Sequence, residues 1–429
     1  QNAYNQGGYS CDNSVADKGD ENIMKPGIHN FSEIGKLNKV LLHRLGDEVE
    51  GLVPDNFERL LFDDIPYLKV AQQEHDRFAQ LLRDNGVEVV YYLDETAKAL
   101  EKPGVKSKFI KEFLDASHIY SQGVYEELSE YLENMSACDV VSKAIAGIKK
   151  GEIADIKHKS LADYISVSYP YYTDPMPNLY FTRDPGACIG SGINIHHMST
   201  QARRREPLLL KYMYMYNDDF TTDREHIWYD YNDEFSIEGG DVLVLSKDTV
   251  AIGLSQRTTV SGIERFSKNL LSGSDFKKII VFDIPKCRAF MHLDTVFTMV
   301  DYDKFTIHHE IEDPLHLFEI SLDRQGEVKV RSVTDSLTNL LKLELSLPAV
   351  ELIRCGGEDL MAAQREQWND GSNTLCIAPG KVVTYERNYV TNDILDKKGL
   401  TVLTVPSAEL SRGRGGPRCM SCPVNRDDL

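Results

Sequence analysis

The sequence predicts an α/β fold in which a repeated unit closes into a ring and a helical module is inserted near the N-terminus. Two observations lead to this prediction. Hairpin, helix and strand patterns recur beyond residue 172, and a Lys/Glu-rich helical stretch precedes them. Strand-rich repeats that cannot bury their own faces tend to close into a ring. We therefore expect the ends of equivalent strands to meet near one axis.

Composition narrows the class of protein. With 429 residues and 41% hydrophobic residues, the chain can bury a substantial core. A net charge of -19 argues against a nucleic-acid partner, because binding to phosphates depends on Lys and Arg. No apolar run approaches the roughly 18 residues of a membrane span, and the N-terminus lacks a signal pattern. The eight cysteines have no framework spacing, which indicates reduced thiols and a cytoplasmic protein.

The N-terminal part contains a leader and the first repeat. Residues 1–23 are polar and turn-rich, so we expect a disordered or artificial leader. Residues 39–44 predict a short strand. Asp64 is expected to cap a helix that starts at Pro66, whose apolar residues share one face. Residues 87–93 then predict a buried strand, which completes a strand, helix, strand unit.

Residues 94–172 differ from this pattern, since apolar residues recur three and four positions apart in a Lys/Glu-rich background. They predict an inserted helical module that covers one side of the main domain, with helices over residues 109–116, 124–132 and 140–148.

The remaining chain repeats one unit. Two copies are clear, each with a hairpin, a helix and a strand that ends before proline, and two looser hairpins bring the total, with the N-terminal unit, to about five weak repeats. The clear copies cover hairpins 237–253 and 371–385, helices 263–271 and 393–398, and strands 278–283 and 400–405; the looser hairpins cover 181–198 and 291–308.

Polar residues precede three of these hairpins. They are Asp184, then Glu238 and Asp241, then His292 and Asp294. In a pseudosymmetric ring, equivalent positions converge on the axis, so these side chains are expected to meet.

The C-terminal stretch, residues 411–423, supplies a candidate nucleophile. Cys419 follows three glycines and three arginines. Glycine-rich backbone beside a thiol lets the main chain approach a ligand closely, and neighbouring cations favour the nucleophilic thiolate. The stretch therefore predicts a functional cysteine.

The acidic residues and His292 permit two kinds of site. They are compatible with a divalent metal, but no second histidine stands at ligand spacing. The other site is a pocket for a planar guanidinium, which carboxylates bind through paired hydrogen bonds. A thiolate aimed at the guanidinium carbon would form a covalent adduct, with His292 protonating the departing amine. Taken singly, each residue could equally serve a loop salt bridge, a turn or the core, and only their predicted convergence favours catalysis.

Four segments resemble the signature motifs of arginine deiminases, in the same order. The resemblance covers nearly the whole chain after about Met24. It implies a five-bladed α/β propeller (pentein fold), formed by residues 24–93 and 173–429, with residues 94–172 as the inserted helical module. It also implies hydrolysis of free L-arginine to L-citrulline and ammonia without a cofactor or metal, by a homo-oligomer. The motifs are Phe181-Thr-Arg-Asp-Pro185, Glu238-Gly-Gly-Asp241, Met291-His-Leu-Asp294 and Arg412-Gly-Arg-Gly-Gly-Pro-Arg-Cys-Met-Ser421.

The resemblance further implies individual roles. Cys419 corresponds to the nucleophile, His292 to the general acid and base, and Glu238 to the carboxylate that orients His292 and keeps it charged. The positions that correspond to substrate-binding residues are Asp184 and Asp294 at the guanidinium, Asn178, Arg203 and Arg257 at the substrate carboxylate, and Arg414 on a mobile loop.

Other functions remain open at this point. An amidinotransferase or a dimethylarginine hydrolase shares the same chemistry, whereas an agmatine enzyme has no use for Arg203 and Arg257 as carboxylate partners. Cys419 and Cys422 form a C-x-x-C pair, compatible with a redox switch or half a zinc site, although Pro423 follows at once. The third alternative is a catalytically inactive binding protein on the same scaffold.

Overall fold

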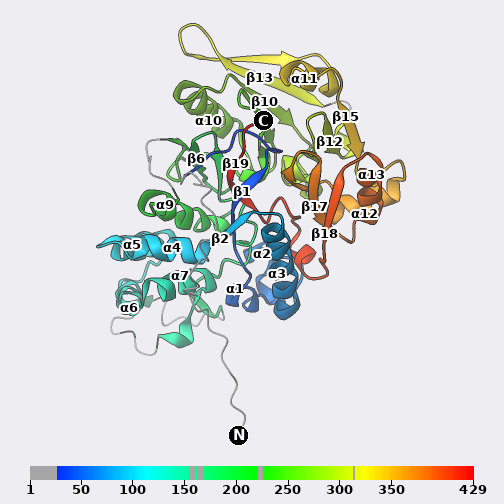
Figure 1. Cartoon of the computed structure of the whole chain (residues 1–429). Coiled ribbons are helices and arrows are strands. Elements are labelled where there is room, and N and C mark those ends of the chain that lie inside the picture. The colour runs from blue at the N-terminus through cyan, green and yellow to red at the C-terminus, as the bar shows by residue number, and fades with distance from the viewer. Residues whose placement is uncertain (1–26, 154–155, 157–159, 162–168, 221–225, 313–314) are drawn as a thin grey trace.

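The computed structural model describes residues 27–153, 156, 160–161, 169–220, 226–312 and 315–429. The leader expected at residues 1–23 lies outside this range. The described chain forms mixed α/β sheets with helices packed around them (Figure 1). The predicted α/β class is therefore confirmed.

Five sheets share one pairing pattern. In each, a middle strand is antiparallel to one neighbour and parallel to the other. Such a parallel neighbour requires a crossover connection. In sheet order, the strands are β19 (Cys422–Arg426), β1 (Leu37–Leu42) and β2 (Glu88–Tyr91); β5 (Gly186–Ile189), β6 (Gly192–Ile195) and β7 (Ile227–Tyr229); β8 (Val242–Val244), β9 (Thr249–Leu254) and β10 (Lys278–Asp283); β11 (Phe297–Met299), β12 (Lys304–Ile307) and β15 (Glu351–Arg354); and β16 (Leu375–Ala378), β17 (Lys381–Tyr385) and β18 (Thr401–Val405).

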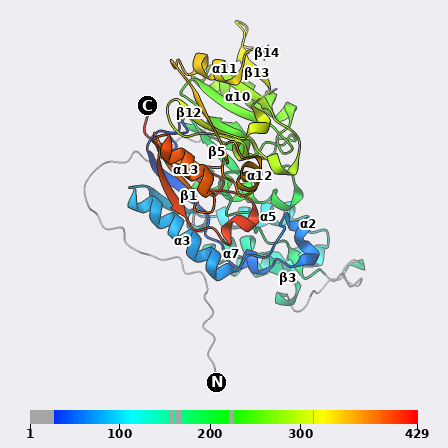
Figure 2. The same cartoon turned by 90° about the vertical axis from the view of Figure 1, so that its right-hand side faces the viewer.

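Two further hairpins depart from the pattern. Strands β13 (His316–Leu322) and β14 (Val328–Val333) extend the sheet of β10, because β13 pairs antiparallel with β10 along its length. Strands β3 (Ile148–Lys149) and β4 (Tyr171–Thr173) form a separate short pair. The β13–β14 hairpin and the helices α4 to α7 lie at opposite ends of the molecule (Figures 1 and 2).

The helices follow the apolar periodicity of the sequence. Helix α10, for example, buries Ile263, Phe266 and Leu270 on one face, and Thr259 caps its start by accepting a hydrogen bond from Gly262 N. The helices are α1 (Asp47–Glu50), α2 (Phe57–Leu60), α3 (Leu68–Asp84), α4 (Tyr92–Leu100), α5 (Val105–Ala116), α6 (Gln122–Glu133), α7 (Ala137–Ala146), α9 (Glu206–Tyr216), α10 (Val260–Gly273), α11 (Leu337–Glu344), α12 (Leu360–Trp368) and α13 (Tyr389–Lys397).

The region of the expected helical module holds α4 to α7. These helices bury one core with α9, to which Phe109, Leu128 and Leu209 contribute. The first of them starts earlier than expected, since the strand predicted over residues 87–93 ends at Tyr91 and α4 begins at Tyr92. Burial of Tyr92 and Leu93 against this core favours the helix over the continued strand.

The helix expected from Pro66 begins at Leu68 and is not capped by Asp64. Tyr67 occupies the capping position in an extended conformation. Asp64 stands four residues before the first residue of the helix. Its carboxylate accepts a hydrogen bond from Ile65 N and pairs with Arg412 instead.

The sheet of β1 joins the two ends of the described chain. Strand β19 pairs antiparallel with β1, with Leu41 opposite Cys422. This pairing brings the C-terminal stretch to the middle of the fold, in the same sheet as the first strand. Cys419 therefore lies among the sheets rather than on an extended tail.

Candidate active site

The candidate site residues precede the first strand of successive sheets. Asp184 comes two residues before β5, Asp241 directly before β8, and Cys419 three residues before β19. Asp241 and Asp294 lie in the 3-10 turns Gly239–Asp241 and Leu293–Thr295. Glu238 and His292 are the N-cap residues of these two turns. The predicted convergence of these side chains is confirmed by the contacts between them.

Cys419 is buried and held through its backbone. Its amide donates to Oδ1 of Asn373 at 2.9 Å, and its carbonyl accepts a hydrogen bond from Arg183 N. The Sγ atom lies 3.7 Å from Oδ2 of Asp294. The sulfur is therefore placed beside one of the two expected guanidinium ligands.

The surroundings of Cys419 hold its thiol protonated, contrary to expectation. Burial raises the pKa of Cys419 well above its ordinary value, and the charges of Asp294, Asp184 and Asp370 raise it further. The three arginines of the C-terminal stretch were predicted to favour the thiolate. They do not, because each lies against another group: Arg412 pairs with Asp64, Arg414 stacks on Trp368 and Arg418 pairs with two acids.

Arg418 is a buried bridge beneath the site. Its Nε and Nη2 donate to Glu33 at 3.1 and 3.2 Å, and its Nη1 donates to Oδ2 of Asp294 at 2.8 Å. The other oxygen of Asp294, Oδ1, is buried and has no hydrogen-bond partner within the described residues. One carboxylate oxygen of Asp294 is thus held by Arg418, and the other is available to accept a hydrogen bond.

His292 and Glu238 form a buried pair. Nε2 of His292 lies 2.7 Å from Oε2 of Glu238, and Nδ1 lies 3.8 Å from Oδ1 of Asp184. The other oxygen of Glu238 accepts a hydrogen bond from Ser199 N and lies 3.8 Å from Nη1 of Arg257. A side chain at Gly240 would lie within 2.6 Å of the imidazole, so only glycine permits this approach.

The charges in this pair are set by its surroundings. Burial alone would lower the pKa of His292, but the charge of Asp184 and the hydrogen bond to Glu238 raise it to about 9. Burial alone would raise the pKa of Glu238, but Arg257 and His292 lower it to about 2. His292 is therefore an imidazolium at neutral pH, and Glu238 is ionised.

Asp184 is held by Arg203 and a backbone amide. Nη1 of Arg203 donates to Oδ2 at 2.6 Å, and Gly240 N donates to Oδ1 at 3.2 Å. The remaining guanidinium nitrogens of Arg203 donate to Glu206 and to the carbonyls of Asn178 and Phe181. In this structure Arg203 thus braces Asp184 instead of facing the pocket with free donors.

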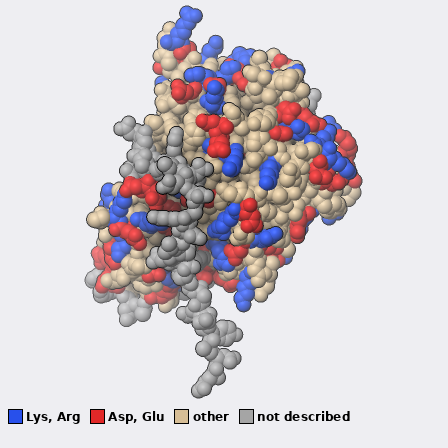
Figure 3. All heavy atoms as spheres, in the orientation of Figure 1, with Lys and Arg blue, Asp and Glu red and all other residues tan. Residues whose placement is uncertain are grey.

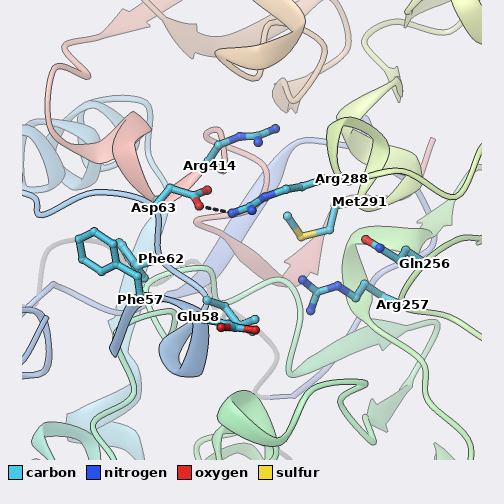
Figure 4. A pocket seen from close by; sticks show the side chains of 11 residues that line it. Phe57, Glu58, Phe62, Asp63, Gln256, Arg257, Arg288, Met291 and Arg414 are labelled. Atoms are coloured by element: carbon cyan, nitrogen blue, oxygen red, sulfur yellow. Dashed lines mark hydrogen bonds and ion pairs between the residues drawn. The ribbon is translucent and has the colours of Figure 1, made fainter. Parts of the chain in front are cut away.

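Cys419, His292, Asp184 and Arg203 line a small inner cavity of about 40 Å³. It adjoins an outer cavity of about 410 Å³, with which it shares Leu61, Arg257, Met291, Gly413 and Arg414. Figure 4 shows the outer cavity, with Met291 between Arg288 and Arg257 and with the ion pair of Arg288 and Asp63 at its edge. The inner cavity is lined by Asn178, Phe181, Asp184, Arg203, His292, Thr295 and Cys419, besides the shared residues.

Sequence reasoning missed Asn373, Glu33 and the bracing role of Asp241. Asn373 precedes β16 just as the other site residues precede their strands, so the repeat itself could have identified it. Asp241 accepts hydrogen bonds from Ser255, Thr258 and Leu293 N, and it fixes the turns instead of facing the cavity. Glu33 lies outside every predicted repeat, and no sequence signal marks it.

The cysteines outside the site include both free thiols and a disulfide-bonded residue. Cys422 is buried at the start of β19, with its sulfur 3.9 Å from the carbonyl of Gly186. Six described cysteines carry free thiols, whereas Cys138 is disulfide-bonded, so the expectation of reduced thiols fails at that position.

Two further findings concern other classes of site. No helix in the described part of the chain has both the length and the apolar character needed to cross a membrane. Among the described residues, no group of three or more His, Cys, Asp or Glu side chains is arranged to hold a metal ion. Basic and acidic side chains are interspersed over the face in Figure 3.

Comparison with known proteins places these features in context. A model of the arginine deiminase family matches residues 58–426. An arginine deiminase of Clostridium perfringens is 52% identical, over 93% of this chain and 98% of the relative. One of Streptococcus equi subsp. equi is 50% identical, over 94% and 98%. Among solved structures, SxtG, an amidinotransferase from Microseira wollei, superposes with a TM-score of 0.51 at 15% identity, over 94% of this chain and 98% of that one, which shows a shared fold.

Proposed function

The chain belongs to the arginine deiminase family, and we propose that it hydrolyses free L-arginine to L-citrulline and ammonia through a covalent adduct on Cys419. The family makes it a hydrolase of an amidino C–N bond. The observation that carries the proposed mechanism is the position of the Cys419 sulfur, 3.7 Å from Asp294 and in one cavity with Asp184 and His292.

Binding of the guanidinium is the first proposed step. Asp184 lines the inner cavity, and Asp294 lies beside the sulfur of Cys419, which also lines it. Oδ1 of Asp294 has no hydrogen-bond partner among the described residues. A guanidinium presents planar donors that match two carboxylates, so the two acids would hold its carbon in front of the sulfur. Holding the reacting atoms in line removes much of the entropic barrier.

Formation of the thiolate follows from the charge of the substrate. Three acids raise the pKa of Cys419, and a bound cation would offset their charge beside the sulfur. The thiol proton would pass to solvent water, because His292 is already protonated, and the sulfur would attack the guanidinium carbon to form a C–S bond. The free site thus keeps its nucleophile inactive until a cation arrives.

Proton transfer by His292 completes both halves of the reaction. Its pKa of about 9 supplies an imidazolium that protonates the departing nitrogen, so the C–N bond breaks and ammonia leaves. The resulting neutral imidazole would take a proton from water, which attacks the thiouronium carbon. The C–S bond then breaks, citrulline is released and the cysteine is restored.

The amino-acid end of the substrate extends toward the outer cavity in this proposal. Asn178, Arg203 and Arg257 would hold its carboxylate, and Arg414 would cover it from the loop. Arg257 is best placed, because its Nη1 has no hydrogen bond within the described residues. Arg203 would first have to release one of its present partners, so its role depends on a shift of the pocket.

We extend the proposal to the architecture. The five sheets with one pairing pattern would be the blades of a five-bladed propeller, formed by residues 24–93 and 173–429, with residues 94–172 as an inserted helical module. The common position of the site residues before each first strand supports the pseudosymmetry. We also propose a cytoplasmic homo-oligomer of two or more subunits; the six free thiols among the described residues support a reducing compartment, and the disulfide at Cys138 does not.

Product analysis tests the function. Wild type and Cys419→Ala are incubated with L-arginine, agmatine and methylated arginine, and the products are identified by mass. The proposal predicts citrulline and ammonia from arginine, with the variant inactive. Transfer of the amidino group to an added amine would instead indicate an amidinotransferase, and preference for agmatine would contradict the assigned carboxylate contacts.

A further inference from the structure

We propose that Trp368 is a positioning residue for Arg414: its indole holds the guanidinium at the rim of the inner cavity and keeps it away from the buried carboxylate of Asp370. The inference rests on the proposed function, because its effect is read through turnover of arginine. It adds a residue outside the cavity lining to those that set the affinity for substrate.

The contact between Arg414 and Trp368 is direct. Cζ of Arg414 lies 3.3 Å from the centroid of the Trp368 ring, in a cation–π arrangement. Trp368 is the last residue of α12 and is 49% exposed, so the ring is free of the core on one side. Because the Trp368 ring is half exposed, it contributes little to the hydrophobic core, and the ring contact described for it is with the charged side chain of Arg414.

No hydrogen bond fixes the guanidinium of Arg414. Its Nε and Nη1 are buried without a hydrogen-bond partner within the described residues. Its backbone has φ of 63°, between Gly413 and Gly415, where a non-glycine residue is strained. The Trp368 ring is thus the described contact that holds the guanidinium of Arg414 in place.

Asp370 offers a competing position only two residues after Trp368. Helix α12 ends at Trp368 with Asn369 as its C-cap, and Asp370 follows with a φ of 62°. The Asp370 side chain is buried, and its Oδ2 has no hydrogen-bond partner among described residues. Burial raises the pKa of Asp370 to about 7, against the opposing charge of Arg414. Asp370 and Arg414 thus each have a buried polar atom without a hydrogen-bond partner among the described residues, and their charges act on each other while the indole contacts the cation.

Movement of Arg414 to Asp370 would oppose substrate binding. Arg414 lines the inner cavity, and the proposed function gives it the amino-acid end of the substrate. A guanidinium bound to Asp370 would leave that position, and the substrate would lose the contact. Loss of the indole should therefore weaken binding of arginine more than it slows the chemical step.

The test uses four variants of the full chain: Trp368→Ala, Trp368→Phe, Asp370→Asn and the double variant Trp368→Ala/Asp370→Asn. Steady-state citrulline formation is measured against arginine concentration. Trp368→Ala should raise KM about fivefold, as expected for loss of one cation–π contact, with kcat changed less than about twofold. Trp368→Phe keeps a ring and should restore most of the affinity, and Asp370→Asn in the alanine background should lower KM again because the competing carboxylate is gone.

Three results would overturn the inference: an unchanged KM in Trp368→Ala, an equal loss in Trp368→Phe, or no recovery in the double variant. A merely structural role for Trp368 would lower kcat and the melting temperature and would not respond to Asp370→Asn. Should Trp368→Ala fold poorly, Trp368→Leu compared with Trp368→Phe decides the same point. Failure of the wild type to form citrulline would instead refute the proposed function and is seen in the same assay.

Discussion

Glu238 lies 2.7 Å from His292 in a fully buried pair, and the pair combines a lowered pKa on the acid with a raised pKa on the imidazole. An ion pair removed from water is maintained only when both charges find close partners. Here Ser199 N, Arg257 and Asp184 supply those partners. The site therefore holds a charged general acid in place before substrate arrives.

The pH profile should reveal this charge. The pKa of His292 is raised from 6.5 to about 9, so the imidazolium is present below that value and is lost as the pH rises through it. We expect kcat/KM to fall above about pH 9. Glu238→Gln removes the charge that raises this pKa, and the alkaline limb should move down by about one pH unit. Glu264→Gln, which removes an exposed carboxylate on α10, is the control and should leave the limb in place; an unmoved limb in Glu238→Gln would refute the assigned pairing.

Substitutions of Cys419 and Cys422 test which of the two cysteines is the nucleophile. Cys419→Ser should reduce kcat by about a thousandfold or more, because the reacting sulfur is lost. Cys422→Ser should leave most of the activity, since its sulfur packs against the carbonyl of Gly186 away from the cavity lining. Both are measured by citrulline formation on protein with matched circular dichroism. Equal losses in the two variants would reverse the assignment and favour a redox pair.

The cysteine pKa should respond to a bound cation. In the free site, burial and three acids keep the Cys419 thiol protonated. A non-reactive guanidinium analogue should lower its pKa, because the added positive charge offsets Asp294 and Asp184. Alkylation rates followed against pH, with and without the analogue, give the shift, and the reaction of Cys419→Ala reports the background of the other thiols. An unchanged pKa would contradict substrate-assisted activation.

The buried bridge of Arg418 should contribute strongly to stability. Glu33→Ala removes both hydrogen bonds between the Arg418 guanidinium and the Glu33 carboxylate, and Asp294 alone remains as its acidic partner. Breaking a buried pair in this way costs about 3 kcal/mol of unfolding free energy. Urea denaturation measures the loss. Glu319→Ala, which breaks the surface pair with Arg331, is the matched control and should cost far less. Equal losses would show that the bridge is dispensable.

Much of the site could be predicted because several of its residues recur at equivalent positions of the sequence repeat. Asp184, Glu238, His292 and Asp294 stand at equivalent places at hairpins that the sequence repeat located, whereas Cys419 was predicted from its glycine- and arginine-rich stretch. Spacing alone thus predicted the convergence of residues that lie more than a hundred positions apart. The same logic extended to the fourth hairpin would have identified Asn373.

The protonation state of Cys419 could not be predicted from the residues next to it in the sequence. The arginines of residues 411–423 stand beside Cys419 in the chain, yet Arg412 and Arg418 pair with Asp64 and Glu33, which lie in distant segments. The acids that raise the pKa of Cys419 come from other connections. Such effects depend on long-range pairing and burial, as does the bracing of Asp184 by Arg203.

The boundary of α4 was mispredicted for a related reason. Residues 87–93 read as one strand, but Tyr92 and Leu93 pack into the core of the helices that follow. Packing of these two residues against the core favours helix over strand, and local propensity does not include such a tertiary contact.

Direct detection of the adduct tests the central claim. Wild-type protein is mixed with saturating L-arginine, quenched in acid within the first turnovers and analysed by peptide mass spectrometry. The account predicts a peptide containing Cys419 that is heavier by the mass of arginine less ammonia, and no such peptide in Cys419→Ala. Turnover to citrulline without any adduct on Cys419, or an adduct on another residue, would contradict it.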